Sequence, residues 1–291
     1  MNDSSNFDVT PSNERHIGEI IRRMNNISAD QVAEILKYQR DNGVKFGEAA
    51  VALGLARRED ILWALSQQFS YQYTNDANHP GDGSLVVASN PFSEVAELFR
   101  DLRSQLISSV FDHQPLSKKS LAIVSPEVGD GKSFVAANLA IAFSQLGART
   151  LLVDADMRTP TQSQLFGLKP SGGGLSGILS GRNESSLVRP IIEIETLFLL
   201  PVGVVPPNPL ELVQQQGFSQ LLADLSSTFD HIVIDTPAVS HGVDAKVIAA
   251  KAGAALMVAR SGHSRTAALS KLSASLKRSN VKVAGVLLND H

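Results

Sequence analysis

The sequence of 291 residues contains no cysteine. Disulfides, zinc sites built from thiolates and a cysteine nucleophile are therefore excluded, and the composition is compatible with a reducing cytoplasm. The seven histidines are scattered, and no H-E-x-x-H pair provides metal-ligand spacing. The formal net charge of −3 offers no excess of positive charge, so we expect no nucleic-acid partner.

Long hydrophobic runs are also missing. No stretch approaches the roughly 18 uncharged apolar residues of a membrane-spanning helix. The polar segment 1–13 lacks the apolar centre of a secretory signal. Hydrophobic residues nevertheless make up 43% of the chain, which is enough for a sizeable core. We therefore expect a cytoplasmic chain that is long enough for one large domain and a smaller one.

The composition changes along the chain. We expect residues 1–13 to be a disordered N-terminus. Residues 14–73 carry Ile, Leu, Val and Ala at intervals of three and four, which predicts a small, mainly helical domain. Residues 74–90 are rich in Pro, Gly, Asp and Asn and predict a linker. The remaining residues, 91–291, alternate apolar runs with helical stretches and form the larger domain.

The apolar runs of the larger domain are candidate strands. Near-continuous apolar strands separated by helices predict an α/β fold, with a mostly parallel sheet between helices. Ligands of such sheets bind beyond the carboxyl ends of the strands. The candidate strands are residues 120–125, 149–156, 196–203, 231–236, 254–260 and 283–290.

A candidate phosphate-binding loop follows the first of these strands. Residues 125–134, SPEVGDGKSF, end in the G-K-S tail of the pattern G-x-x-x-x-G-K-[ST]. Pro126 stands where that pattern begins with glycine. An Ala-rich helix follows, so the loop presents a helix N-terminus, whose N–H groups favour phosphate. Taken alone, the tail also fits a plain turn.

Carboxylates at the ends of two other strands support a nucleotide site. Asp154 and Asp156 alternate on one side of the strand in LLVDADMR, and Asp235 ends the strand in HIVIDTP. Each aspartate by itself fits a helix cap or a turn. Together with the G-K-S tail they indicate a bound Mg²⁺, because three carboxylates buried without a cation would be costly.

These motifs together resemble those of the bacterial tyrosine kinases. SPEVGDGKS, LLVDADMR and HIVIDTPA look like their Walker A, A′ and B motifs, and LFLLPVGVVPPNPLEL looks like their proline-rich loop. The EpsG-type chain-length-determinant tyrosine kinases of exopolysaccharide systems are the most similar members. The resemblance spans about residues 91–289 and implies a P-loop NTPase of the ParA/MinD-like class. It also accounts for Pro126, since the family tolerates a residue other than glycine at that position.

The main competing interpretation is a ParA/MinD-like ATPase switch without kinase activity. Such proteins share the fold and the aspartates but carry an additional lysine where this sequence has Glu127. A glutamate cannot supply that charge. No basic amphipathic tail follows VLLNDH, as a membrane-tethered member of that class would need. The sequence therefore favours the kinase branch.

The resemblance assigns roles to individual residues. It implies an ATP-dependent protein-tyrosine kinase in which Asp154 accepts the proton of a tyrosine hydroxyl, whose unperturbed pKa is about 10. Lys132 and Asp156 complete the expected catalytic set. The expected Mg²⁺ ligands are Ser133, Asp156 and Asp235. The expected nucleotide-binding residues are Gly129, Asp130, Gly131, Lys132, Ser133, Phe134, Arg158 and, near adenine, Asn289.

The resemblance also implies partners. ELFRDLR matches the oligomerisation pattern E-x-x-R-x-x-R of the family through Glu97, Arg100 and Arg103. A solvated helix face with ion pairs three residues apart fits the same residues. We expect a homo-oligomer that is peripheral at the inner face of the plasma membrane. The expected partner there is a transmembrane polysaccharide co-polymerase, the chain-length determinant protein.

Tyrosines are few in this sequence. Family members usually end in a tyrosine cluster that neighbouring subunits phosphorylate, whereas the tyrosines here are Tyr38, Tyr71 and Tyr73. Three explanations stay open: phosphorylation of other proteins, phosphorylation of the pair at 71 and 73, and an ATPase switch. Aromatic packing is the simpler role for that pair.

The N-terminal domain contains a repeat. Residues 16–39 align with residues 45–68 in two units of 24 residues. Their pattern is similar to the tandem motif of the MshEN domain of secretion and pilus ATPases, which binds cyclic di-GMP. A helical protein-docking module, whose glycines only permit close packing, is the alternative. The residues implied for cyclic di-GMP are His16, Ile17, Gly18, Ile21, Lys45, Phe46, Gly47, Val51 and Gly54.

Overall fold

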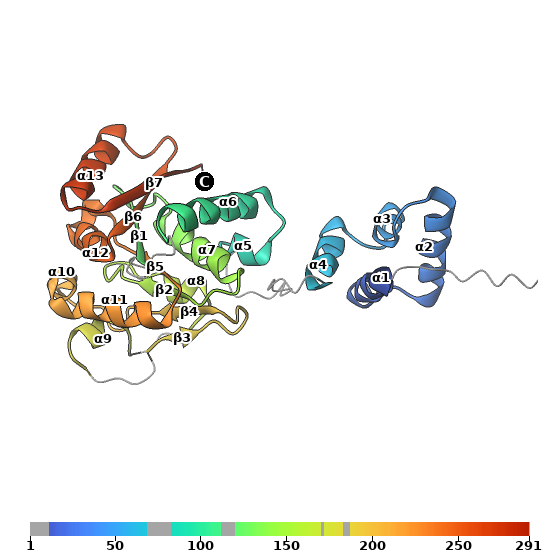
Figure 1. Cartoon of the computed structure of the whole chain (residues 1–291), viewed down its shortest axis with the longest axis horizontal. Coiled ribbons are helices and arrows are strands. Elements are labelled where there is room, and N and C mark those ends of the chain that lie inside the picture. The colour runs from blue at the N-terminus through green and yellow to red at the C-terminus, as the bar shows by residue number, and fades with distance from the viewer. Residues whose placement is uncertain (1–11, 69–82, 112–119, 170–171, 183–186, 291) are drawn as a thin grey trace, which may run out of the picture. The chain divides into compact units, whose positions relative to one another are not determined.

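The contacts of the chain divide it into two units, Met1–Asn75 and Asp76–His291. The computed structural model describes residues 12–68, 83–111, 120–169, 172–182 and 187–290 (Figure 1). None of the helices in these ranges is long and apolar enough to cross a membrane. Tyr71 and Tyr73 lie outside the described residues.

In the N-terminal unit, each repeat is a pair of helices. Ser28 starts the second helix because its hydroxyl accepts the Gln31 N–H while the Gln31 side chain accepts the Ser28 N–H. Ile21 and Ile35 are fully buried in the core of the unit, and Tyr38 packs against that core. The first helix includes the last two residues of the segment 1–13, which was expected to be disordered; residues 1–11 lie outside the described residues. The helices are α1 (Ser12–Met24), α2 (Ala29–Asn42), α3 (Phe46–Ala52) and α4 (Arg58–Gln68).

The described part of the larger unit is built on a seven-stranded sheet in the order β3-β4-β2-β5-β1-β6-β7. Neighbouring strands are parallel except β3, which pairs antiparallel with β4 at one edge. All six predicted strands are present, whereas β3 has only two residues and carries no strand signal in the sequence. The strands are β1 (Ser120–Val124), β2 (Thr150–Asp154), β3 (Arg189–Pro190), β4 (Leu197–Leu200), β5 (His231–Asp235), β6 (Ala254–Arg260) and β7 (Lys282–Asn289).

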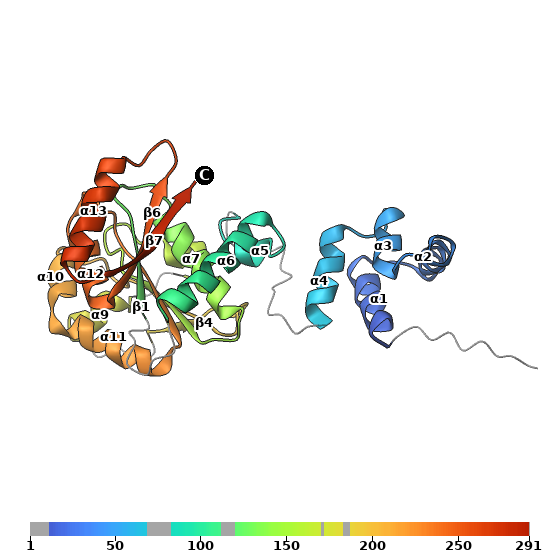
Figure 2. The same ribbon diagram turned by 45° about the horizontal axis from the view of Figure 1, so that its top comes forward.

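Helices cover both faces of this sheet (Figures 1 and 2). Alternate residues of β1 reach the two cores: Leu121 and Ile123 pack with α5, α6 and α7, whereas Ala122 and Val124 pack with α9, α11, α12 and α13. A strand that is buried on both faces reads as a continuous apolar run. The helices are α5 (Val86–Ser89), α6 (Glu94–Ser109), α7 (Lys132–Ser144), α8 (Gln162–Leu165), α9 (Leu175–Leu179), α10 (Pro209–Gln214), α11 (Gln216–Thr228), α12 (Asp244–Ala252), α13 (Thr266–Arg278) and the 3₁₀ turn η1 (Val239–His241).

Residues 85–90, which the sequence analysis assigns to the linker, pack instead into the larger unit. Val87 is fully buried, and its N–H donates to Oδ1 of Asn138 on α7 at 3.0 Å. The amide of Asn138 donates in turn to the Ser84 carbonyl at 2.8 Å. A buried asparagine that satisfies main-chain groups of another segment fixes that segment in place. The linker prediction is therefore wrong for its last residues, and residues 74–82 lie outside the described residues.

Candidate functional site

The phosphate loop joins β1 to α7 at the carboxyl ends of the strands. Gly129 and Gly131 have φ values of +83° and +96°, in the left-handed region that glycine adopts without strain. A Cβ atom at Gly131 would overlap the amide of Asn289. That amide donates to the Asp130 carbonyl at 3.2 Å. Asn289, which the family resemblance places near adenine, therefore lies against the loop.

The unusual entrance of the loop is fixed by hydrogen bonds to the segment after β5. The carbonyl of Pro126 accepts the N–H of Ser240 at 2.9 Å, and the carbonyl of Ser125 accepts the N–H of Val239 at 3.0 Å. These bonds use carbonyl groups, so a proline, which has no N–H, satisfies them as well as a glycine does.

Asp130 holds the middle of the loop. Its side chain is fully buried and accepts the Glu127 N–H at 2.9 Å and the Ser264 hydroxyl at 2.7 Å. His263 lies 3.1 Å from the same carboxylate. Because the carboxylate is directed toward these groups, Asp130 offers a nucleotide its main chain rather than its side chain. The sequence does not indicate the contacts with His263 and Ser264, because these residues lie more than a hundred positions from Asp130.

The carboxylates of Asp154 and Asp235 stand at paired positions on the neighbouring strands β2 and β5. Both side chains are almost fully buried. The two oxygens of Asp154 accept the N–H groups of Asp156 and Gln162, each at 3.2 Å. Oδ2 of Asp235 accepts the side-chain amide of Gln162 at 2.7 Å. Oδ1 of Asp235 has no hydrogen bond of good geometry among the described residues.

Burial perturbs both carboxyl groups. Burial raises the pKa of Asp154 well above its usual value, and the nearby charge of Asp235 raises it further. Burial raises the pKa of Asp235 to about 6, although hydrogen bonds from Gln162 and Ser133 and the ammonium group of Lys132 oppose the shift. Two buried acids therefore carry their negative charge at a cost unless a cation joins them.

The residues of the loop fit a magnesium ion that is shared with a nucleotide. No three His, Asp or Glu side chains among the described residues are grouped so that they hold a metal alone. Mg²⁺ typically takes one or two protein ligands and completes its shell with water and phosphate oxygens. The Ser133 hydroxyl and Oδ1 of Asp235, which has no hydrogen bond of good geometry among the described residues, would provide such a partial set. Lys132, which begins α7 and is 7% exposed, provides the positive charge for phosphate.

Asp156 and Arg158 have partners of their own. The Asp156 carboxylate accepts the N–H groups of Arg158 and Thr159 at 3.1 and 2.9 Å and the Thr159 hydroxyl at 2.9 Å, so it shapes its own turn. Arg158 is expected at the nucleotide. Its Nη2 group instead donates to both carboxylate oxygens of the buried Asp244 at the start of α12. A Cβ at Gly242 would collide with this ion pair.

Some residues of the site carry no signal in the sequence. Gln162 is fully buried and bonds to the carboxylates at the ends of β2 and β5. No sequence motif singles out a glutamine at this position. The side chain of Phe134 lies edge-on to Phe99 of α6, with centroids 5.9 Å apart. Phe134 therefore belongs to the core, and only its main chain is left for phosphate.

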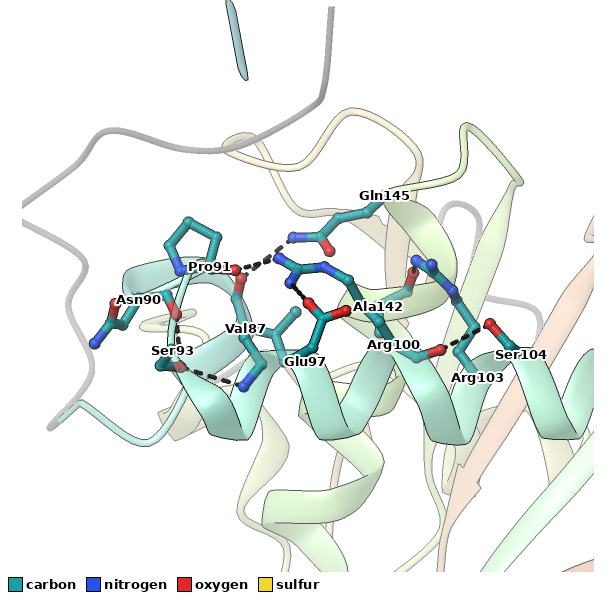
Figure 3. A network of polar contacts seen from close by, with 11 residues as sticks. Val87, Asn90, Pro91, Ser93, Glu97, Arg100, Arg103, Ser104, Ala142 and Gln145 are labelled. Atoms are coloured by element: carbon teal, nitrogen blue, oxygen red, sulfur yellow. Dashed lines mark hydrogen bonds and ion pairs between the residues drawn. The ribbon is translucent and has the colours of Figure 1, made fainter. Parts of the chain in front are cut away.

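The three residues of the expected oligomerisation motif lie on α6 (Figure 3). Arg100 pairs with Glu97 and donates to the Pro91 carbonyl. Arg103 donates to the Ala142 carbonyl on α7 at 2.7 Å. Both arginines thus have partners within their own chain, whereas the side chain of Glu97 is 73% exposed.

The residues expected to bind cyclic di-GMP have mixed surroundings. Ile21 is fully buried, so its side chain is not accessible for the expected contact with cyclic di-GMP. A Cβ at Gly47 would lie 2.8 Å from Cγ2 of Ile61, so glycine is needed there for packing α3 against α4. Gly18 lies next to the ring of Phe46, which is itself partly buried.

Other residues of that set remain accessible. Lys45 and Val51 are exposed, and Gly54 has a φ of +68°, which any larger residue would adopt only with strain. The side chains of His16 and Ile17 lie outside the described ones. The accessible part of the expected site is therefore the start and end of α3.

A pH dependence follows from the buried Asp235. Its folded pKa of about 6 lies above the ordinary aspartate value of 3.8, so between these pH values the folded state holds a proton that the unfolded state releases. The resulting stability is present at low pH and is lost as pH rises through about 6. Without nucleotide and Mg²⁺, we expect the free energy of unfolding of Asp235→Asn at pH 8 to exceed that of the wild type by up to about 3 kcal/mol. The variant should therefore unfold at a higher urea concentration. The difference should shrink toward pH 4.5.

The matched control is Asp224→Asn, at an exposed aspartate on α11. Its effect on the free energy of unfolding should be small at every pH, as measured by circular dichroism. A benefit of Asp235→Asn that does not change with pH would contradict the expectation.

Comparison with known proteins agrees with this geometry. The model of the CobQ/CobB/MinD/ParA nucleotide-binding domain (CbiA) matches residues 121–291, which confirms the α/β P-loop NTPase fold of ParA/MinD type. CapB of Staphylococcus aureus, whose name is "Putative tyrosine-protein kinase CapB", is 34% identical over 205 residues, or 70% of this chain and 88% of its own. The tyrosine-protein kinase Wzc of Salmonella typhimurium is 38% identical over 208 residues, but this chain covers only 28% of it.

A solved structure gives the same answer. The kinase domain of the Escherichia coli tyrosine kinase ETK superposes with a TM-score of 0.65 at 29% identity and covers 70% of this chain and 79% of that domain. The chain therefore belongs to the bacterial tyrosine kinase family.

Proposed function

We propose that the chain transfers the γ-phosphoryl group of ATP to tyrosine and thereby regulates the chain length and export of an exopolysaccharide, as an EpsG-type member of its family would. The observation that carries the proposal is the buried Asp154 beside a phosphate loop. A carboxylate at this position can accept the proton of an incoming hydroxyl group. Phosphoryl transfer otherwise asks a protein mainly for positioning and charge stabilisation.

The proposed roles are those that the family resemblance implies. Lys132 and the N–H groups of the loop would bind the phosphates. Ser133 and Asp235 would hold Mg²⁺ with its water ligands, and Asp156, whose carboxylate also bonds its own turn, would contact these waters. Bound Mg²⁺ offsets the negative charge of the phosphates. Asp154 accepts the proton of the tyrosine hydroxyl. Its two hydrogen bonds to main-chain N–H groups fix the carboxylate in place before substrate arrives.

The proposed partner is a transmembrane polysaccharide co-polymerase at the inner face of the plasma membrane. Its cytoplasmic segment would complete the active site, so the chain on its own would be a poor kinase. The named relatives include tyrosine-protein kinases of two lengths: CapB, which this chain spans almost fully, and Wzc, which is much longer.

Substitution of the phosphate-loop lysine tests the nucleotide site. We expect Lys132→Met to weaken ATP binding roughly 10- to 100-fold, since a charge-assisted hydrogen bond contributes about 1.5–3 kcal/mol. Lys277→Met, on the exposed side of α13, is the matched control. Calorimetry measures the affinity, and transfer from labelled ATP to a Glu-Tyr copolymer, with and without the co-polymerase segment, measures kinase activity. Hydrolysis of ATP without phosphotyrosine under both conditions would favour the ATPase switch.

We also propose that α6 joins subunits into a homo-oligomer. Glu97 is the exposed member of its motif, whereas Arg100 and Arg103 also hold the fold together. We therefore expect Glu97→Lys to convert the oligomer to a monomer in light scattering without loss of folding. Asp224→Lys makes the same charge change on α11 and should leave the mass unchanged. An unaltered mass of the Glu97→Lys variant would exclude α6 as the interface.

For residues 14–73 we propose an MshEN-like domain that binds cyclic di-GMP and couples polymer production to this second messenger. A ligand with two guanines and two phosphates suits a duplicated helix pair. The tight packing of Gly47 favours the alternative, a protein-docking module, because it gives that glycine a role without any ligand.

Calorimetry on residues 1–80 distinguishes the two. We expect Lys45→Ala to weaken cyclic di-GMP binding about tenfold, because the exposed ammonium group lies where a phosphate contact is expected. Lys37→Ala, at an exposed lysine on α2, is the matched control. Gly47→Asp is unsuitable, since it would displace Ile61 and unfold the unit. Absence of heat at high micromolar ligand would identify a docking module.

A further inference from the structure

Gln162 is a buried polar side chain for which the roles above give no account. It begins α8, and its side chain is 0% exposed. Glutamine is rarely buried so completely unless its amide is bonded. Here the Nε2 group donates to the Ser133 carbonyl at 3.1 Å and to Oδ2 of Asp235 at 2.7 Å. The Gln162 amide therefore bonds to both Ser133 and Asp235, the two residues that are expected to ligate Mg²⁺.

Two acceptors are left over by this arrangement. Nε2 has two hydrogens, and both are used, so Gln162 can donate to nothing else. Its Oε1 is buried and has no hydrogen-bond partner among the described residues. Oδ1 of Asp235 is also buried and makes no hydrogen bond of good geometry among them, although the Ser133 side chain lies close enough to lower the pKa of Asp235. A buried acceptor without a donor costs free energy. Two such acceptors on bonded neighbours indicate that donors arrive with a ligand.

We propose that Gln162 is a positioning residue for the hydrated Mg²⁺ of the bound nucleotide. Its amide occupies Oδ2 of Asp235 and so directs Oδ1 toward the water ligands of the ion, while its own Oε1 accepts from the same water shell. Mg²⁺ keeps several of its waters when it binds between protein and phosphate. Residues that orient metal ligands in this way typically change metal affinity 10- to 100-fold. The inference rests on the proposed binding of ATP with Mg²⁺.

The contact between Gln162 and the proposed base is separate from this role. The main-chain N–H of Gln162, not its side chain, donates to Oδ2 of Asp154 at 3.2 Å. A substitution of the side chain therefore removes the link to Asp235 and Ser133 and keeps the bond to Asp154. The effect of such a variant on the metal can be read without disturbing the base.

The test uses Gln162→Leu and Gln162→Met in the full chain, which keep the buried volume and remove the amide. Gln145→Leu is the matched control, because the Gln145 amide also donates to a main-chain carbonyl, that of Val87, and its Oε1 is also buried without a partner (Figure 3). Calorimetry measures ADP affinity in Mg²⁺ and in EDTA, and thermal melting identifies the folded variants. The second Gln162 variant provides the result if the first does not fold.

We expect the gain in ADP affinity that Mg²⁺ produces to fall about tenfold or more in both Gln162 variants. Their affinity in EDTA, and both affinities of Gln145→Leu, should match the wild type. A full Mg²⁺ gain in the Gln162 variants would overturn the positioning role, as would an equal loss in Mg²⁺ and EDTA. A wild-type chain that binds no ADP in either buffer would contradict the proposed function itself.

Discussion

Two carboxylates that are buried side by side constrain the whole site. Asp154 and Asp235 end neighbouring strands, and burial in a medium of low dielectric raises the pKa of each. Two negative charges on neighbouring strand ends repel each other, which raises the free energy of the folded state unless hydrogen-bond donors or cations surround them. The ammonium of Lys132, the amide of Gln162 and the N–H groups after β2 all converge on this pair. The repulsion between the two carboxylates is unfavourable without a cation. A cationic ligand would relieve it, which favours binding of that ligand.

The phosphate loop depends on segments that are distant in the sequence. Asp130 is bonded to the turn before α13, Pro126 to the segment after β5, and the Asp130 carbonyl to Asn289 at the end of β7. A glycine-containing loop is conformationally permissive, so fixing it requires bonds from outside. Segments at the ends of three strands thus fix the conformation of the loop. The conformational entropy of the loop is therefore lost during folding rather than on binding of phosphate.

In the N-terminal unit, the residues of the repeat that pack the core differ from those that the proposed ligand would contact. Gly47 and Gly18 lie against Ile61 and Phe46, which accounts for glycine by close helix contact. Lys45, in contrast, is exposed and contributes nothing to the core, so packing gives no reason for its charge. The repeat is therefore a structural duplication, and its accessible residues are the ones that the proposed binding of cyclic di-GMP would use.

By itself, the sequence determined the six strands, the parallel sheet and the position of the phosphate loop. Apolar runs and the G-K-S tail are local patterns, and the chain order of strands and helices restricts how they pack. It also placed Asp154 and Asp235 at the carboxyl ends of parallel strands, on one edge of the sheet. That β2 and β5 are neighbours, so that the two carboxylates meet, was decided by the order of the strands in the sheet. Family resemblance added roles to these positions that composition alone does not contain.

Only the tertiary structure decided which of the polar side chains serve the fold. Arg158 pairs with Asp244, Arg103 with a carbonyl of α7, and the end of the expected linker with Asn138. Gln162 became visible as part of the site for the same reason. These contacts join residues dozens of positions apart, and a hydrogen bond depends on distance and direction in space, which no local spacing of residue types encodes.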